Sequence, residues 1–322
     1  MTGIVTTVLG PVPVEQLGVV SVHEGLLSVI PGAEHAFDIT IDRAAIFEAL
    51  AARLREFRDA GGGTVVDSTG MFHGRDVPLL EALARSTGVH IVASTGMGPE
   101  ELLGGYFLTP QTNPPTPWPA DRFARLFEQE IVDGMVVARR ERRCGAGLIV
   151  TTATRDGATA TDESLLRGTA RAAITTGAPA SIRFGADAVH DLELALAEGL
   201  DASRVVVGGL DRRDAVAAGA HLEVARRGAF VGIDHVGADD AEHVADDERV
   251  ALVAELVAAG HADRILLSSS ATGVAIGHAG RDVPYAHILT SFVPALRAAG
   301  LDEAVIRRIL IDNPGELLAV RS

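Results

Sequence analysis

The sequence predicts an α/β fold of the (β/α)8 barrel class, the TIM barrel. Eight short apolar runs, several of them rich in β-branched residues, are typical of buried parallel strands. Eight longer amphipathic segments alternate with these runs and show helical periodicity. This alternation over 322 residues favours one barrel domain that spans residues 1–322. A doubly wound open sheet is the alternative, because a sequence does not show whether a sheet closes.

The elements follow one another in order from residue 18 to residue 298. Most expected strands are flanked by Gly or Asp, which favour the turns between strands and helices. The expected strands are residues 18–22, 63–67, 89–94, 147–151, 180–184, 204–207, 229–234 and 264–268. The expected helices are residues 43–58, 77–86, 121–132, 161–174, 191–198, 214–218, 249–258 and 285–298.

The longest gap between these elements is a loop at about residues 96–120, which is rich in proline. A loop of this length in a compact domain is usually functional. Because it follows the third strand, we expect it to cover the C-terminal face of the barrel, where such folds place their sites. Tyr106 and Trp118 are two of its aromatic residues, and we expect them to wall a substrate pocket.

Composition excludes several kinds of function. All 28 basic residues are arginine, and the net charge is -15, which argues against nucleic acid or an anionic membrane as a partner. The single cysteine, Cys144, excludes an internal disulfide and a cysteine-based zinc site. It fits a reducing compartment, so we expect a cytoplasmic protein. We see neither a signal peptide nor an apolar run long enough to span a membrane.

The C-terminal ends of the expected strands carry a ring of polar residues. In a barrel these ends converge on one site. The ring includes His23, Glu24, Asp67, Arg183, Asp211, Asp234, His235, Ser269 and Ser270, and the last loop adds His278 and Arg281. No His-x-His and no His-Glu-x-x-His is present, so the ring is a poor metal cage.

Short motifs in a fixed order carry a resemblance to a known family. They are VTTVLGPV (5–12), HEGLL (23–27), GRD (74–76), AGLI (146–149), TRDG (154–157), GAP (177–179), DHVG (234–237), YAHIL (285–289) and DNP (312–314). In order and spacing the chain resembles the phosphotriesterase family of the amidohydrolase superfamily, from about residue 5 to residue 319. The resemblance implies a (β/α)8 barrel that hydrolyses phosphotriesters, lactones or related esters with two divalent metals.

The chain departs from this family at the residues that the resemblance assigns to the metals. His23 keeps one ligand position. The other five positions carry Gly25, Val150 in place of a bridging carbamylated lysine, Arg183, Gly209 and Ser270. Gly25, Val150 and Gly209 are therefore vestigial metal positions. We predict no metal and no cofactor, because Arg183 also places a positive charge where a cation would lie.

Two interpretations of the altered site stay open. In the first, Arg183 binds an anion or oxyanion, and His23 acts as acid or base oriented by Asp67 or Asp234. Ser269, Ser270, His235, His278 and Arg281 then contact the substrate. This describes a metal-independent lyase, cyclase, isomerase or hydrolase acting on an anionic or carbonyl-bearing small molecule. In the second, the barrel is a pseudoenzyme that binds a ligand or partner.

Structural roles for these residues also stay open. His23 could be a hydrogen-bonded core histidine, and Arg183 could form a buried salt bridge with Asp67 or Asp234. A metal-dependent hydrolase remains the least favoured interpretation. The expected partner is a small molecule, and a homodimer is an additional expectation.

Overall fold

A nine-stranded parallel sheet forms the centre of the structure, a computed structural model that describes residues 3–31, 33, 36–71, 73–103, 118–137 and 141–321. The order of its strands is β12-β11-β10-β9-β8-β5-β4-β3-β13. The strands are β3 (Val19–Val29), β4 (Gly62–Asp67), β5 (His90–Thr95), β8 (Leu148–Thr152), β9 (Ala180–Arg183), β10 (Val205–Gly208), β11 (Phe230–Ile233), β12 (Ile265–Leu267) and β13 (Thr272–Ile276). Two short antiparallel pairs flank the sheet, β1 (Ile4–Thr7) with β2 (Gly10–Pro13) and β6 (Val136–Val137) with β7 (Glu141–Arg142).

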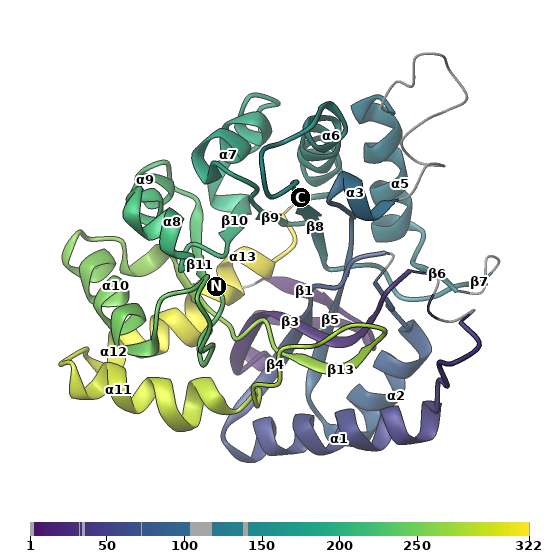
Figure 1. The fold of residues 1–322 in the computed structure, drawn as a ribbon, viewed down its shortest axis with the longest axis horizontal. Coiled ribbons are helices and arrows are strands. Elements are labelled where there is room, and N and C mark those ends of the chain that lie inside the picture. Colours follow the sequence, from purple (N-terminus) through teal and green to yellow (C-terminus); the bar gives the residue numbers. More distant parts are fainter. Residues whose placement is uncertain are drawn as a thin grey trace.

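Helices surround the strands, as the ribbon shows (Figure 1). The longer ones are α1 (Arg43–Asp59), α2 (Val77–Thr87), α5 (Ala120–Val132), α6 (Ala160–Thr176), α7 (Ala188–Leu196) and α10 (Asp246–Ala258). Shorter ones are α3 (Glu100–Leu103), α8 (Arg213–Ala217), α9 (Ala220–Arg226), α11 (Val293–Ala298), α12 (Glu303–Arg307) and α13 (Asn313–Leu318). None of the helices among these residues is long and apolar enough to cross a membrane.

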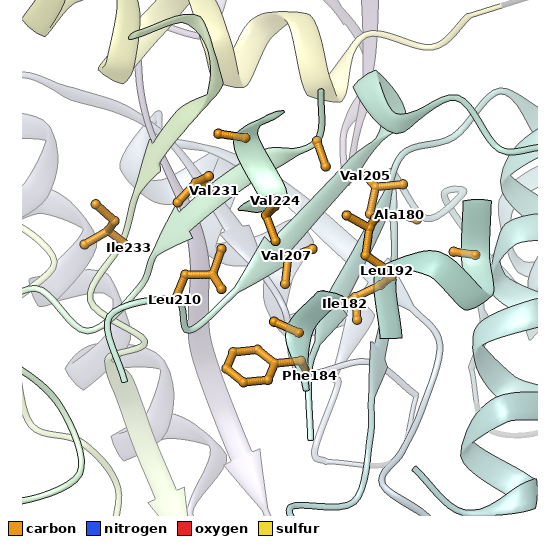
Figure 2. Close-up of a cluster of buried hydrophobic side chains, with 14 of the residues drawn as sticks. Ala180, Ile182, Phe184, Leu192, Val205, Val207, Leu210, Val224, Val231 and Ile233 are labelled. Carbon is orange, nitrogen blue, oxygen red and sulfur yellow. The ribbon is translucent and has the colours of Figure 1, made fainter. Parts of the chain in front are cut away.

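Side chains that alternate between the two faces of each strand form two separate apolar layers. In β10, Val206 belongs to a cluster inside the ring of strands, whereas Val205 and Val207 belong to a larger cluster between strands and helices. Figure 2 shows Val207 in this outer layer, together with Leu192 of α7 and Val224 of α9. Successive strand residues point to opposite faces, so each strand buries both of its faces.

The ring of strands closes through two consecutive strands. β12 pairs with β11, and β13, which follows it directly, pairs with β3 through Thr272 opposite Gly25. Residues 268–271 between them belong to neither strand. Gly25 N donates to Ala271 O across this gap at 2.8 Å. The gap is therefore the seam at which the first and last parts of the barrel meet.

The predicted (β/α)8 class is confirmed, and each of the eight expected strands overlaps an observed one. The main difference is β3, which extends to Val29 rather than ending near residue 22. Its second half pairs with β13, a strand that the sequence analysis did not expect. Residues 104–117 of the expected loop, including Tyr106, lie outside the described residues.

Candidate active site

Two cavities lie at the C-terminal ends of the strands, and Arg183 at the end of β9 lines both of them. The first has a volume of about 250 Å³ and the second about 310 Å³. Thr152 at the end of β8 is the other residue that they share. Arg183 therefore occupies the centre of the site, as the sequence predicted from its place at a strand end.

The guanidinium of Arg183 is held by hydroxyl groups. Nη2 donates to Ser68 Oγ at 3.2 Å and to Ser270 Oγ at 3.3 Å. Within the described part of the chain, Arg183 has no ion-pair partner, and its Nε is buried without a hydrogen bond. The alternative of a structural salt bridge with Asp67 or Asp234 therefore does not fit the observed contacts. The cation keeps hydrogen-bonding capacity for another group.

The first cavity suits a polar, anionic group. No carboxylate is found among the described residues that line it. Burial lowers the pKa of His73, and the charges of His278 and Arg183 act in the same direction. Six of the fifteen described lining residues carry a hydroxyl group, and the wall consists of Gly25, Ser28, Ser68, Thr69, Gly70, His73, Met97, Gly98, Pro99, Leu102, Val150, Thr152, Arg183, Ser270 and Thr272. Met97 to Leu102 show that the start of the expected loop does reach the site.

His23 lies beneath this surface and lines neither cavity. It is completely buried, with Nε2 at 2.8 Å from Ser181 Oγ and Nδ1 at 2.7 Å from Asp234 Oδ2. Inside the barrel, Nε2 thus makes a hydrogen bond, whereas Nδ1 lies close to the carboxylate without hydrogen-bond geometry. The predicted role of His23 as an acid or base acting on substrate does not fit this position, and the alternative of a core histidine does.

Asp234 is the main hydrogen-bond acceptor of this buried network. Its carboxylate also accepts from Ser268 Oγ at 2.7 Å and from Gly209 N at 2.8 Å. Burial acts to raise the pKa of Asp234, but His23 and the charge of Arg183 outweigh it, so the pKa lies below its ordinary value. The predicted orientation of His23 by Asp234 is therefore present as a contact, and Asp234 also lines the second cavity.

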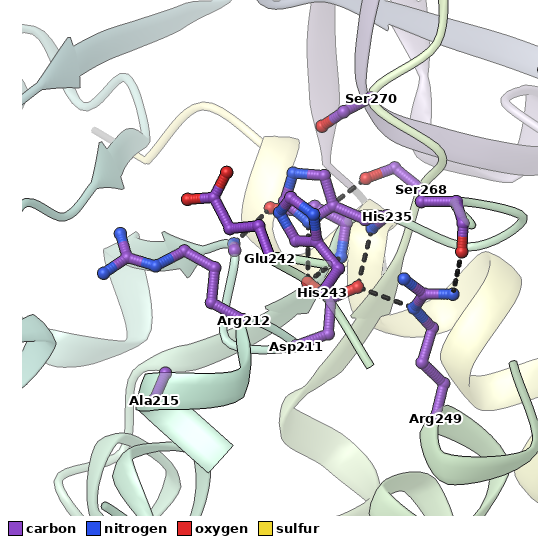
Figure 3. Close-up of polar contacts among 12 residues, drawn as sticks. Asp211, Arg212, Ala215, His235, Glu242, His243, Arg249, Ser268 and Ser270 are labelled. Carbon is purple, nitrogen blue, oxygen red and sulfur yellow. Dashed lines mark hydrogen bonds and ion pairs between the residues drawn. The ribbon is translucent and has the colours of Figure 1, made fainter. Parts of the chain in front are cut away.

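His235, which follows β11, lines the second cavity and pairs with Asp211, a fully buried residue that follows β10. His235 Nδ1 lies 2.7 Å from Asp211 Oδ1, and Arg249 Nε donates to Asp211 Oδ2 at 2.8 Å (Figure 3). Burial acts to raise the pKa of Asp211, but His235 and Arg249 hold it well below its ordinary value. Asp211 thus stays ionised and fixes the His235 ring. No described residue bonds to Nε2 of His235, which lies on a side chain that lines the cavity.

A second imidazole lies against this pair. The ring centroids of His235 and His243 are 3.7 Å apart, and His243 Nδ1 lies 2.7 Å from Asp240 Oδ1. Burial and the charge of His235 lower the pKa of His243 despite Asp240. Arg281 binds the same Asp240 at 2.9 Å. The stacked arrangement therefore favours a neutral His243 ring beside His235.

Two further carboxylates are buried under the site. Glu24 accepts from Ser21 Oγ at 2.6 Å, Ser269 N at 2.9 Å and Ala271 N at 2.7 Å. Burial raises the pKa of Glu24 to about 7 and that of Asp67 to about 6, although hydrogen bonds act in the other direction. Asp67 binds Leu26 N and Thr69 Oγ1 and does not line a cavity.

The remaining predicted residues divide between the site and the core. Ser270 and Arg281 each line a cavity, and the exposed His278 contacts Ser28 at the mouth of the first one at 2.8 Å. Ser269 instead is buried, and its side-chain oxygen has no hydrogen-bond partner. Trp118 packs against Phe123 and Arg122 in the outer layer rather than lining a cavity, because it begins the turn into α5.

Of four further residues in or beneath the site, Glu24 and Asp211 were placed in the expected polar ring without a role, whereas His73 and His243 were not predicted at all. Asp211 follows a strand end, and Glu24 lies inside the HEGLL motif, so a signal existed for both. His73 and His243 lie on loops with no motif of their own. Their place depends on where those loops return to the barrel, which residue spacing does not show.

The residues present do not fit the two metals that the resemblance implies. Five of six ligand positions carry Gly25, Val150, Arg183, Gly209 and Ser270, and the sixth, His23, is sealed by Ser181 and Asp234. Within the described ranges, no three His, Cys, Asp or Glu side chains are grouped so as to hold a metal ion. The residues present therefore do not support a mechanism that uses a metal.

Comparison with known proteins identifies the class. The model of the Phosphotriesterase family matches residues 3–318, so the chain belongs to the phosphotriesterase family. A phosphotriesterase homology protein of Mycobacterium tuberculosis is 30% identical over 96% of this chain and 95% of its own. An N-acetyltaurine hydrolase of Salmo salar is 28% identical, over 100% and 99% of the two chains.

A solved structure agrees in fold. It comes from work on the molecular engineering of organophosphate hydrolysis activity from a weak promiscuous lactonase template, and it superposes with a TM-score of 0.87. It covers 99% of this chain and 100% of its own, at 24% identity. This likeness shows the barrel fold alone.

The buried Glu24 predicts a specific pH dependence of stability. Folded Glu24 holds its proton up to about pH 7, whereas an ordinary glutamate releases it near 4.5. Ionising it therefore destabilises the fold as pH rises between these values, by about 3 kcal/mol in all. We expect the unfolding free energy of the wild type, relative to Glu24→Gln, to fall as pH rises from 4.5 to 8. Urea unfolding of both proteins measures this difference, and a constant or rising difference would contradict it.

Proposed function

We propose that this chain is a hydrolase-type acid–base enzyme that works without divalent metals on a small anion carrying a carbonyl group. The observation on which the proposal rests is the set of contacts that Arg183 makes. This cation lies between two cavities and is bound by the hydroxyls of Ser68 and Ser270 rather than by a carboxylate. A planar guanidinium with free donors is suited to a carboxylate, sulfonate or phosphate.

The other arginines of the second cavity differ from Arg183 in this respect. Arg155 pairs with Asp214 and Glu242, and Arg281 pairs with Asp240. Arg212 pairs with Asp214 and donates to two backbone carbonyls. Their charges are already compensated by the protein, so an incoming anion gains most from Arg183.

The Asp211–His235 pair supplies acid–base chemistry beside this cation. Nε2 of His235 can take a proton from water, while Asp211 holds Nδ1 and stabilises the imidazolium that forms. The activated water adds to the substrate carbonyl, and the leaving amine or alcohol takes the proton back from Nε2. The products are an acid and an amine or alcohol, and no metal or redox partner takes part.

Relatives support the hydrolytic direction. Several of them, including the Salmo salar protein, are named N-acetyltaurine hydrolase, and they match the whole chain at 24–28% identity. N-acetyltaurine combines an amide carbonyl with a sulfonate, so its chemistry fits both Arg183 and the Asp211–His235 pair. We therefore choose N-acetyltaurine as the first substrate to test, followed by other N-acyl and ester anions.

A ligand-binding protein without catalysis is the second candidate. It is favoured by His23, the surviving family ligand, which is locked between Ser181 and Asp234. Binding of the anion at Arg183 is common to both candidates. They differ in whether His235 catalyses a reaction of the bound molecule.

Arg183→Gln should weaken anion binding roughly ten- to hundredfold, because charge-assisted hydrogen bonds are lost. Isothermal titration calorimetry with sulfate and with N-acetyltaurine measures this change. Arg155→Gln is the matched control, since Arg155 lines the second cavity but is paired with two carboxylates. Equal losses in both variants would show that the unpaired state of Arg183 has no special role.

His235→Asn should lower kcat by roughly 10²- to 10⁴-fold, because the general base is removed. Affinity for the anion should change little, since Arg183 remains. His221→Asn on α9 is the control, because His221 also contacts a carboxylate, Glu255, but far from the cavities. Unchanged turnover in His235→Asn would exclude the proposed base, and absent turnover in the wild type across the substrate panel would favour the binding protein.

Activity should be insensitive to metal removal. We expect elemental analysis of the purified protein to find far less than two equivalents of zinc, manganese or iron per chain. Prolonged dialysis against EDTA should leave kcat/KM unchanged, because the altered positions offer no set of ligands. Near two equivalents of bound metal, or activity lost to EDTA and restored by zinc, would refute the metal-independent proposal.

A further inference from the structure

We infer that Glu24 is a positioning residue that holds the two hydroxyls on which the Arg183 guanidinium rests. The inference rests on the proposed function, because it assigns a purpose to the place of Arg183. Glu24 itself is completely buried and lines neither cavity. It acts through Ser68 and Ser270, whose hydroxyls both accept from Nη2 of the guanidinium.

The two carboxylate oxygens of Glu24 bind the backbone on either side of Ser270. Oε1 accepts from the backbone N–H of Ser269, and Oε2 accepts from that of Ala271. These are the residues immediately before and after Ser270, so the short segment is fixed at both sides. Ser21 Oγ donates to Oε1 and holds the carboxylate itself in place.

The backbone of Glu24 holds the second hydroxyl. Its carbonyl oxygen accepts from Ser68 N at 2.8 Å and from Ser68 Oγ at 3.2 Å. The proton of the Ser68 hydroxyl is thereby directed to Glu24, and its oxygen is left to accept from Arg183 Nη2. One residue of β3 therefore orients both acceptors of the guanidinium.

The conformation of Ser270 needs this support. Its φ is +43°, and it is the one non-glycine residue with positive φ in the described part of the chain. L-residues other than glycine and asparagine rarely adopt this region, and such conformations persist where their surroundings determine them. Residues 268–271 lie at the seam between β12 and β13, where regular strand pairing is interrupted. The Glu24 carboxylate replaces ladder hydrogen bonds at this point.

The test compares Glu24→Gln with the wild type in two measurements at pH 8, where both side-chain oxygens of Glu24 are acceptors. A glutamine of the same shape offers one acceptor oxygen, so its NH2 group faces a backbone N–H. Hydrogen–deuterium exchange, followed by mass spectrometry of peptides covering residues 265–276, should become faster. Sulfate affinity, measured by calorimetry, should fall roughly tenfold or more as the guanidinium loses its fixed place.

Asp162→Asn is the matched control. Asp162 is another completely buried carboxylate that accepts from backbone N–H groups, those of Glu100, Thr154 and Thr159, and it contacts neither serine. It should leave sulfate affinity and exchange of residues 265–276 unchanged. If Glu24→Gln fails to fold, Ser21→Ala, which removes one donor to Glu24, should shift both measurements in the same direction by less.

The outcomes separate this inference from the proposed function. If Glu24→Gln keeps wild-type sulfate affinity while Arg183→Gln loses it, Glu24 has only a structural role and the inference is overturned. If exchange of residues 265–276 is unchanged, the inference is overturned as well. If Arg183→Gln itself keeps full sulfate affinity, the proposed function fails, and the exchange measurement alone then decides whether Glu24 supports Ser270.

Discussion

The contact between the Glu24 carboxylate and the backbone N–H groups of Ser269 and Ala271 is the constraint on which the site depends. It lies at the seam where the ring of strands closes, so it belongs both to the fold and to the site. Burying a carboxylate is unfavourable, which is visible in its raised pKa. Its hydrogen bonds offset part of that cost and hold Ser270 in a conformation that serine rarely adopts.

Arg183 places a positive charge in this framework. Its guanidinium lies between two cavities at the ends of the strands and, among the described residues, has no carboxylate partner. This arrangement supports the proposed binding of an anion. The inner network of His23, Ser181, Asp234 and Ser268 fills the barrel interior beneath it. The proposed acid–base group has a separate location, His235, which lines the second cavity and pairs with the buried Asp211.

Much of the fold could be predicted, because strand and helix periodicity are local properties of the sequence. β3 was underestimated because its extension to Val29 depends on a partner, β13, that lies more than two hundred residues later. Arg183 was predicted to lie at the site because it ends a barrel strand, and it lines both cavities. His23 was assigned a substrate role that its burial does not fit, since a strand-end residue can point into the barrel or toward its mouth.

The sequence by itself determined the barrel class and the family resemblance, and it supplied the prediction that the metal ligands are replaced, since all of these follow from residue identity and order. Only the tertiary structure decided which polar groups face a cavity and which are paired. Asp67 and His23 are sealed, whereas His73, which carried no signal, lines the first cavity. The physical reason is that burial and pairing of a charge depend on neighbours from distant strands, and these neighbours meet only when the barrel closes.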